Sequence, residues 1–174
     1  EVLDVIMEAN LFPHFRQRPF NTIPDHKIKP RDIFISGLNT APLAVDLEIA
    51  MADEIENFQA GINAIEKLTD GNVYLTNKVD SRLSDVENVN INTIEGPHPS
   101  GNVSIQIHHI SHLKPSELIW TIDPQDVVMI GKLFLKGVYD PSKIISVAGP
   151  GVKNPTHLRV KTGHPVESIL RSNL

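Results

Sequence analysis

The sequence predicts an α/β fold built on a parallel sheet, and the order of its first elements supports this prediction. A short apolar run at 32–37 follows a proline and has the length and composition of a buried strand. Residues 47–68 then repeat apolar side chains at steps of three and four, which predicts a long helix with a solvated acidic face that includes Glu48 and Glu54. A second strand is expected at 72–76. Strand, helix and strand in this order form the βαβ unit of parallel sheets.

The remaining pattern extends this sheet. Asp123 can accept backbone N–H bonds as the cap of a helix, Pro124 suits its first position, and Gly137 suits its end. The other predicted elements are a helix at 1–10 and strands at 87–93 and 118–122. Residues 1–137 are therefore expected to form a Rossmann-like parallel sheet of about four strands with flanking helices.

The pattern changes after residue 137. Strands are predicted at 143–148 and 156–161, with a tight loop between them and a helix that starts near 163. This succession is how a β-grasp module begins. Too few residues follow to bury a core, so 138–174 is expected to be the truncated start of such a domain.

Composition excludes several functions. The chain has 174 residues and a net charge of −5, which argues against a nucleic-acid partner. It has no cysteine, so disulfides, thiolate zinc sites and iron–sulfur ligation within the chain are excluded. No apolar run approaches the ~20 residues that span a bilayer, and no signal peptide is visible. Because the chain begins at Glu1 rather than Met, we expect it to be a fragment of a longer protein, soluble by itself.

The loops that usually hold phosphates are missing. There is no G-x-G-x-x-G after the first strand, no Walker A loop and no G-x-S-x-G elbow. Without closely spaced glycines, the backbone cannot approach a pyrophosphate there. We therefore expect the sheet not to hold a dinucleotide in the usual way, although a flavin or nucleotide module with an unorthodox loop stays as an alternative.

The least generic stretch is 96–112, which holds four of the eight histidines. His108 and His112 share a face whether the stretch is helix or strand, and a metal site would need His98 as a third ligand. A metal-binding module or metalloenzyme centred on these three histidines is therefore an alternative hypothesis. We favour a rigid loop that enters a helix, with His98 and Asn102 forming a contact surface at the carboxyl end of a strand.

A second candidate segment is 15–24. Arg16 and Arg18 stand between aromatic residues and could contact a ring or an anion through their guanidinium groups. The other interpretation is a surface loop that its aromatic side chains fix to the core.

Several segments together carry a family resemblance, and in order they span nearly the whole chain. They are RPF (18–20), NTAPLA (39–44), FQAG (58–61), LTDGNVY (68–74), GPHPSGN (96–102), QDV (125–127), GKLFL (131–135) and VAGP (147–150). In these segments the chain resembles the A subunit of the bacterial Na+-translocating NADH:quinone reductase.

The resemblance implies a domain similar to the flavin- and NADH-binding subunit of respiratory complex I, without its cofactor loop. It implies a peripheral subunit of an NADH:ubiquinone reductase on the cytoplasmic face of the bacterial inner membrane, docked on the B subunit in the membrane. Such a subunit supports quinone reduction coupled to Na+ transport and has no self-contained active site. It implies no cofactor and no metal in this chain, with the flavins and the iron–sulfur centre on partner subunits. The segment that the resemblance associates with quinone corresponds to Arg16, Arg18 and Phe20.

Overall fold

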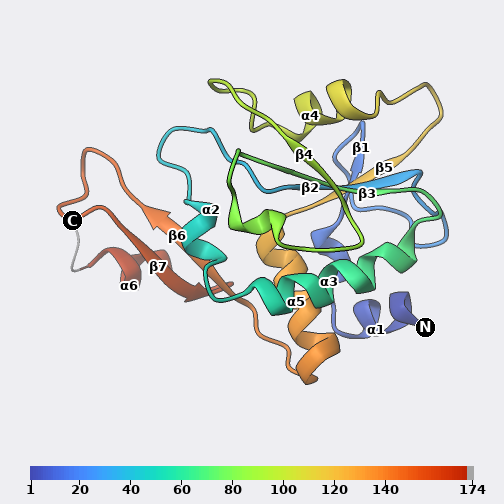
Figure 1. The fold of residues 1–174 in the computed structure, drawn as a ribbon. Helices are drawn as coiled ribbons and strands as arrows, with labels where there is room; N and C mark the ends of the chain where they lie inside the picture. Colours follow the sequence, from blue (N-terminus) through green and yellow to red (C-terminus); the bar gives the residue numbers. More distant parts are fainter. Residues whose placement is uncertain (172–174) are drawn as a thin grey trace.

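A sheet with helices on both faces forms the main body of the computed structural model, which describes residues 1–171 (Figure 1). Five strands lie in the order β1-β5-β2-β3-β4. Strands β2, β3, β4 and β5 are parallel, and β1 is antiparallel to β5. The strands are β1 (Arg16–Arg18), β2 (Asp32–Ser36), β3 (Val73–Asn77), β4 (Asn90–Thr93) and β5 (Ile119–Ile122). The predicted α/β class is confirmed.

The helices form two layers around this sheet. Helices α3 and α5 pack together on one face and α4 covers the other (Figure 1). In the part of the chain described here, none of the helices is long and apolar enough to cross a membrane. The helical elements are α1 (Val2–Glu8), α2 (Leu47–Ala50), α3 (Ile55–Ile65), α4 (Val103–Ile110), α5 (Pro124–Lys136) and the 3-10 turns Phe12–His14, Glu66–Leu68 and Arg82–Ser84.

Strand β2 contributes side chains to two hydrophobic clusters, one on each face of the sheet. Ile33 and Ile35 are fully buried against the layer of α3 and α5, while Phe34 packs with Ile107 in the smaller cluster under α4. A strand buried on both faces is a continuous apolar run, which is why the sequence identified it. The sequence pattern alone did not decide between helix and strand at 102–112. The structure has a helix there, α4 (Val103–Ile110).

Both ends of α5 agree with the sequence. The Asp123 carboxylate accepts the Gln125 N–H at 2.8 Å, and Gly137 has the left-handed φ of 64° that ends helices.

Strand β1 adds an antiparallel edge strand, which was not predicted, to the four parallel strands that were. Gln17 of β1 lies opposite Trp120 of β5. The segment that we interpreted as a possible surface loop is therefore partly an edge strand. Arg16, Gln17 and Arg18 lack the apolar alternation that marks a strand, so the pattern could not reveal it. A short, charged strand is common at a sheet edge, because it discourages pairing with other chains.

The long helix predicted over 47–68 is interrupted, which corrects a second prediction. Helix α2 ends at Ala50 and α3 begins at Ile55. Glu54 lies at the break and is only 8% exposed, so it does not belong to a solvated acidic face. The Lys132 ammonium lies 2.9 Å from its carboxylate. A buried carboxylate needs such a partner, and helical periodicity carries no sign of it.

A two-stranded hairpin follows the main sheet. It consists of β6 (Ser142–Val147) and β7 (Thr156–Lys161), and α6 (Val166–Leu170) comes after it. Gln125 fixes β6 to the start of α5, because its amide group donates to the Ile144 carbonyl at 3.0 Å and accepts the Ile144 N–H at 2.7 Å. The strands agree with the predicted hairpin; residues 172–174 of the predicted second domain lie outside the described residues.

Asp140 joins the hairpin to α5 and is expected to make the stability depend on pH. Burial alone would raise the pKa of Asp140, but hydrogen bonds from Ser142 and the ammonium of Lys132 lower it from 3.8 to about 2. A pKa that is lower in the folded state gives stabilisation above the unfolded value, lost as the pH falls through the folded value. At about pH 6 we expect Asp140→Asn to be roughly 1 kcal/mol less stable than the parent, a value reduced for partial exposure.

Urea unfolding between about pH 6 and pH 2 measures this effect. The difference in free energy of unfolding between the parent and Asp140→Asn should become smaller between about pH 4 and pH 2. Asp53→Asn is the matched control at an exposed position and should differ little from the parent at any pH. A difference in free energy of unfolding between Asp140→Asn and the parent that does not change with pH would contradict the prediction.

Candidate ligand cleft at the switch point of the sheet

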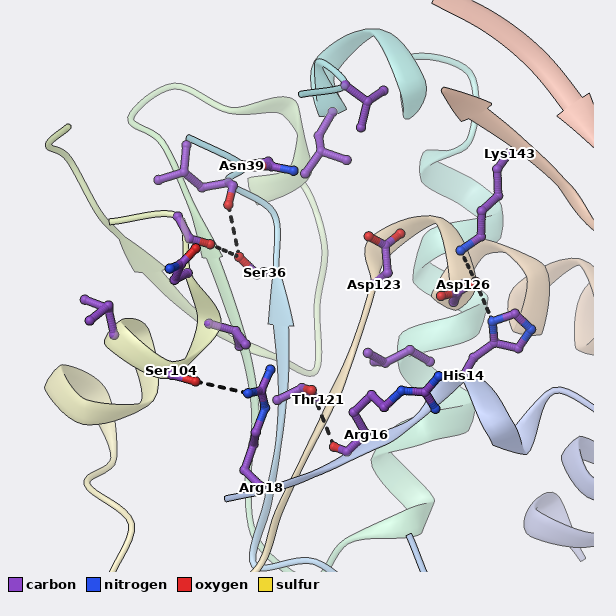
Figure 2. Close-up of a pocket in the computed structure, with 18 residues that line it drawn as sticks. His14, Arg16, Arg18, Ser36, Asn39, Ser104, Thr121, Asp123, Asp126 and Lys143 are labelled. Atoms are coloured by element: carbon purple, nitrogen blue, oxygen red, sulfur yellow. Dashed lines mark hydrogen bonds and ion pairs between the residues drawn. The ribbon is translucent and has the colours of Figure 1, made fainter. Parts of the chain in front are cut away.

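The topology of the sheet creates a cleft between β2 and β5. From β2 the chain adds β3 and β4 on one side and then returns to place β5 on the other side. At such a switch point the loops after the two strands run in opposite directions, and α/β proteins usually bind ligands there. The structure has a cleft of about 750 Å3 at this place, lined by the ends of β2 and β5, the start of α4, and β1 (Figure 2).

Arg16 and Arg18 both line the cleft. The guanidinium of Arg16 is held locally, because it donates to the carbonyls of Pro13 and, at 3.1 Å, Phe15. Arg18 reaches across to the start of α4 and donates to the Ser104 hydroxyl at 3.2 Å (Figure 2). Burial lowers the pKa of Arg18, and its buried Nε has no hydrogen-bond partner within residues 1–171. Arg18 therefore reaches across the cleft, whereas the guanidinium of Arg16 is held against its own segment.

An acid–base cluster lies on the other side of the cleft (Figure 2). The Asp126 carboxylate is 2.9 Å from His14 Nδ1 and 2.7 Å from the Lys143 ammonium. Asp123 is open to the cleft but surrounded by protein on its other sides; this partial removal from water, and then repulsion from Asp126, raises its pKa. This wall therefore presents both hydrogen-bond donors and a carboxyl group whose protonated form is favoured relative to an isolated aspartate.

The predicted site residues do not all meet in this cleft. Asn102 is the N-cap residue of α4 and lines the cleft with Arg16 and Arg18. His98 does not line it within the described chain; its Nδ1 lies 3.3 Å from the Thr40 hydroxyl. Phe20 is 78% exposed and also lies outside the lining.

The three-histidine metal hypothesis gains no support from the structure. Across residues 1–171, no group of three or more histidine, cysteine or acidic side chains is placed to hold a metal ion. His108 and His112 instead contact each other, with their Nδ1 atoms 3.1 Å apart.

Two backbone N–H groups of the loop after β2, those of Gly37 and Ala41, already have partners within the protein. The Gly37 N–H already donates to the Thr76 carbonyl at 2.7 Å, and a Cβ at Gly37 would lie 2.9 Å from the same oxygen. Asn39 accepts the Ala41 N–H at 3.1 Å through its side chain. These backbone donors are therefore engaged within the protein, and Gly37 serves close packing on β3 rather than approach to a ligand.

Sequence reasoning missed much of the cleft lining. Ser36 and Ser104 carried no motif, Asn39 was noted only as part of the segment NTAPLA (39–44), and Asp123 was recognised only as a helix cap. The available signal was the position of Ser36 at the end of one apolar strand and of Asp123 directly after another. The missed polar residues are His14, Ser36, Asn39, Ser104, Thr121, Asp123, Asp126 and Lys143.

Fold and cleft together define a Rossmann-like domain with a cleft at the switch point of its sheet. The family described as the NqrA second alpha/beta domain matches residues 1–139, and the chain belongs to this family. Over 174 residues the chain is 34% identical to the A subunit of the Na(+)-translocating NADH-quinone reductase of Marinomonas sp. (strain MWYL1), covering 100% of this chain and 39% of the relative. The equivalent proteins of Yersinia pestis and Rhodopirellula baltica (strain DSM 10527 / NCIMB 13988 / SH1) are 33% and 32% identical, covering 97% and 98% of this chain and 38% of each relative. The chain thus spans about two fifths of the length of these curated relatives.

Proposed function

We propose that this chain is part of the A subunit of a Na+-translocating NADH-quinone reductase and supports quinone reduction coupled to Na+ transport. The observation that carries the proposal is the alignment of nearly the whole chain with such proteins from several bacteria, at 32% to 34% identity. The structure adds a cleft at the position where related folds bind their ligands.

In this proposal the protein is peripheral, on the cytoplasmic face of the inner membrane, and docks on the B subunit in the membrane. The chain contributes residues 1–137 as one domain and 138–174 as the start of the next. It holds no redox cofactor, and the flavins and the iron–sulfur centre belong to partner subunits. The engaged backbone donors after β2 and the lack of cysteine support this assignment.

The quinone contact in this proposal involves Arg18, with Arg16 and Phe20 in the same segment. Arg18 supports it best, because its side chain lines the cleft and reaches Ser104 at the start of α4, while the guanidinium of Arg16 is held by carbonyls of its own segment. A quinone carbonyl oxygen can accept a hydrogen bond from a guanidinium group.

Arg18→Ala in the complete enzyme complex tests this function. We expect the affinity for a quinone analogue to fall about tenfold, as removal of one hydrogen bond from a charged donor does. NADH oxidation by an artificial electron acceptor should stay unchanged, because that reaction does not need the quinone. Phe20→Ala should weaken quinone binding less, since the Phe20 ring is exposed.

Lys153→Ala, at an exposed position in the loop between β6 and β7, is the control and should bind the analogue as the parent does. Equal quinone affinity and equal quinone reductase activity in the Arg18→Ala and parent complexes would remove the proposed quinone contact. A complex that lacks this whole protein and still assembles and reduces quinone normally would remove the proposed function.

A further inference from the structure

One wall of the cleft holds a cluster of titratable side chains that the proposed quinone contact does not use (Figure 2). Three separate segments bring it together. His14 comes from the 3-10 turn before β1, Asp123 and Asp126 from the start of α5, and Lys143 from strand β6 of the hairpin. Acids and bases that are gathered in this way at the wall of a cleft of about 750 Å3 can exchange protons with a bound ligand.

Asp126 is the buried centre of this cluster, and its side chain is 7% exposed. Its Oδ1 lies 2.9 Å from His14 Nδ1 and 2.7 Å from the Lys143 ammonium. These are ion-pair contacts, because this oxygen accepts no directed hydrogen bond within residues 1–171. The two basic groups balance the buried negative charge of Asp126 and occupy its carboxylate.

Asp123 is the member of the cluster that is open to the cleft. Its carboxylate accepts the Gln125 N–H at 2.8 Å, which fixes the side chain at the cap of α5. Partial removal from water, and then repulsion from Asp126, raises the pKa of Asp123, while the Lys143 ammonium opposes this rise. An apolar ring in the cleft would cover the open side of Asp123 and favour its protonated form further.

We propose that Asp123 is the acid that protonates a quinone oxygen during reduction, an inference that rests on the proposed function and assigns a catalytic residue to it. A quinone takes two electrons and two protons to become a quinol, and each C=O becomes C–OH. The electrons come from a reduced flavin on a partner subunit. The O–H bond of Asp123 breaks as one O–H bond of the quinol forms, and the Asp123 carboxylate then takes a new proton from bulk water. The second quinol oxygen takes its proton directly from bulk water.

The other charged groups of the cleft are less suited to this role. The titratable and charged side chains that line the cleft with Asp123 are His14, Arg16, Arg18, Asp126 and Lys143. Among them Asp126 is the one other carboxyl group of the described lining, and two basic groups already occupy it. His14 directs its Nδ1 at Asp126, and the arginines do not release protons in this pH range. Asp126 and Lys143 are therefore positioning residues, which set how readily Asp123 holds its proton.

Asp123→Asn in the complete enzyme complex tests the inference. Asparagine caps a helix about as well as aspartate does, but it cannot donate a carboxyl proton. We expect kcat for quinone reduction to fall about a hundredfold, as loss of a general acid does, with little change in KM for the quinone. NADH oxidation with an artificial electron acceptor should stay unchanged. Asp46→Asn is the matched control, because Asp46 caps α2 in the same way but does not line the cleft, and it should keep the parent's kcat.

The pH dependence of kcat separates proton donation from a structural role. In the parent, kcat should fall as the pH rises through the pKa of Asp123, because only the protonated form donates. Lys143→Gln removes the ammonium that lowers this pKa, so the fall should move to higher pH. In Asp123→Asn this fall should be absent.

Two results would overturn the inference: an Asp123→Asn complex with the kcat of the parent, or a Lys143→Gln complex with the pH profile of the parent. In either case the proposed function stands if Arg18→Ala still weakens quinone binding, so the two failures can be told apart. If the Asp123→Asn complex also loses NADH oxidation with the artificial acceptor, its assembly is damaged, and the pH profile of Lys143→Gln decides.

Discussion

Replacing Gly131 with alanine is expected to lower the free energy of unfolding by about 3 kcal/mol or more, the upper range for overpacking. Helices α3 and α5 lie in direct backbone contact at Gly131 and Gly61. A Cβ at Gly131 would lie 1.6 Å from the Asn57 carbonyl oxygen, and one at Gly61 would lie 2.1 Å from the Val127 carbonyl oxygen. Backbone atoms cannot rotate away, so the two helices must separate and lose the contacts of buried side chains between them.

The sign of this effect is informative, because the same substitution within an exposed helix stabilises by roughly 1 kcal/mol through helix propensity. Urea unfolding followed by circular dichroism measures the change. Gly151→Ala is the matched control, since a Cβ there meets nothing within 4 Å. The double variant Gly61→Ala with Gly131→Ala should cost less than the sum of the single changes, because one separation of the helices relieves both clashes. A Gly131→Ala variant as stable as the parent would contradict the close approach of α3 and α5.

The sequence could predict the central sheet because burial on both faces leaves a continuous apolar run. Strands β2 and β5 are of this kind, and their predicted positions agree with the structure. Strand β1 could not be found in the same way, since its strand pairing with β5 depends on residues about a hundred positions away in the chain. The prediction that Glu54 lies on a solvated face was wrong for a similar reason, because its burial depends on an ion pair with Lys132 of another helix.

The candidate site was predictable only in part. Arg18 and Asn102 came from segments that stood out in the sequence, and the structure brings both to the cleft. The contact that gives Arg18 its place joins it to Ser104, 86 positions away. Local pattern carries no information on such a pair, and the switch point that creates the cleft depends on the order of strands in space.

Replacing Arg31 with alanine is the second change for which we expect a large effect, a loss of about 3 kcal/mol. Arg31 Nε donates to the Asp32 carboxylate at 2.8 Å, and Asp32 is 4% exposed. The guanidinium also donates to the carbonyls of Ser111 at 2.8 Å and His112 at 3.2 Å. Alanine would leave the Asp32 carboxylate buried without its cation, and an unpaired buried charge is strongly unfavourable.

Lys29→Ala provides the control for this change. Lys29 and Asp70 form an ion pair at 2.6 Å, but their side chains are 60% and 81% exposed, so its loss should stay within about 0.5 kcal/mol. The double variant Arg31→Met with Asp32→Asn should recover part of the lost stability, because a buried pair can be replaced by groups without charge at little cost. An Arg31→Ala variant no less stable than Lys29→Ala would show that the pair has no such role.

We also expect Arg31→Ala to loosen the end of α4 locally, beyond its effect on global stability. Ser111 and His112 directly follow α4, so their contacts with Arg31 fix the end of the helix that carries His108. In native-state hydrogen exchange, Arg31→Ala should speed exchange of the amides at 107–112 more than that of the amides in α3. An equal increase in both helices would mean that Arg31 acts on global stability alone. A larger increase in α4 would mean that the buried Arg31–Asp32 pair, at the start of β2, holds the end of α4 in place.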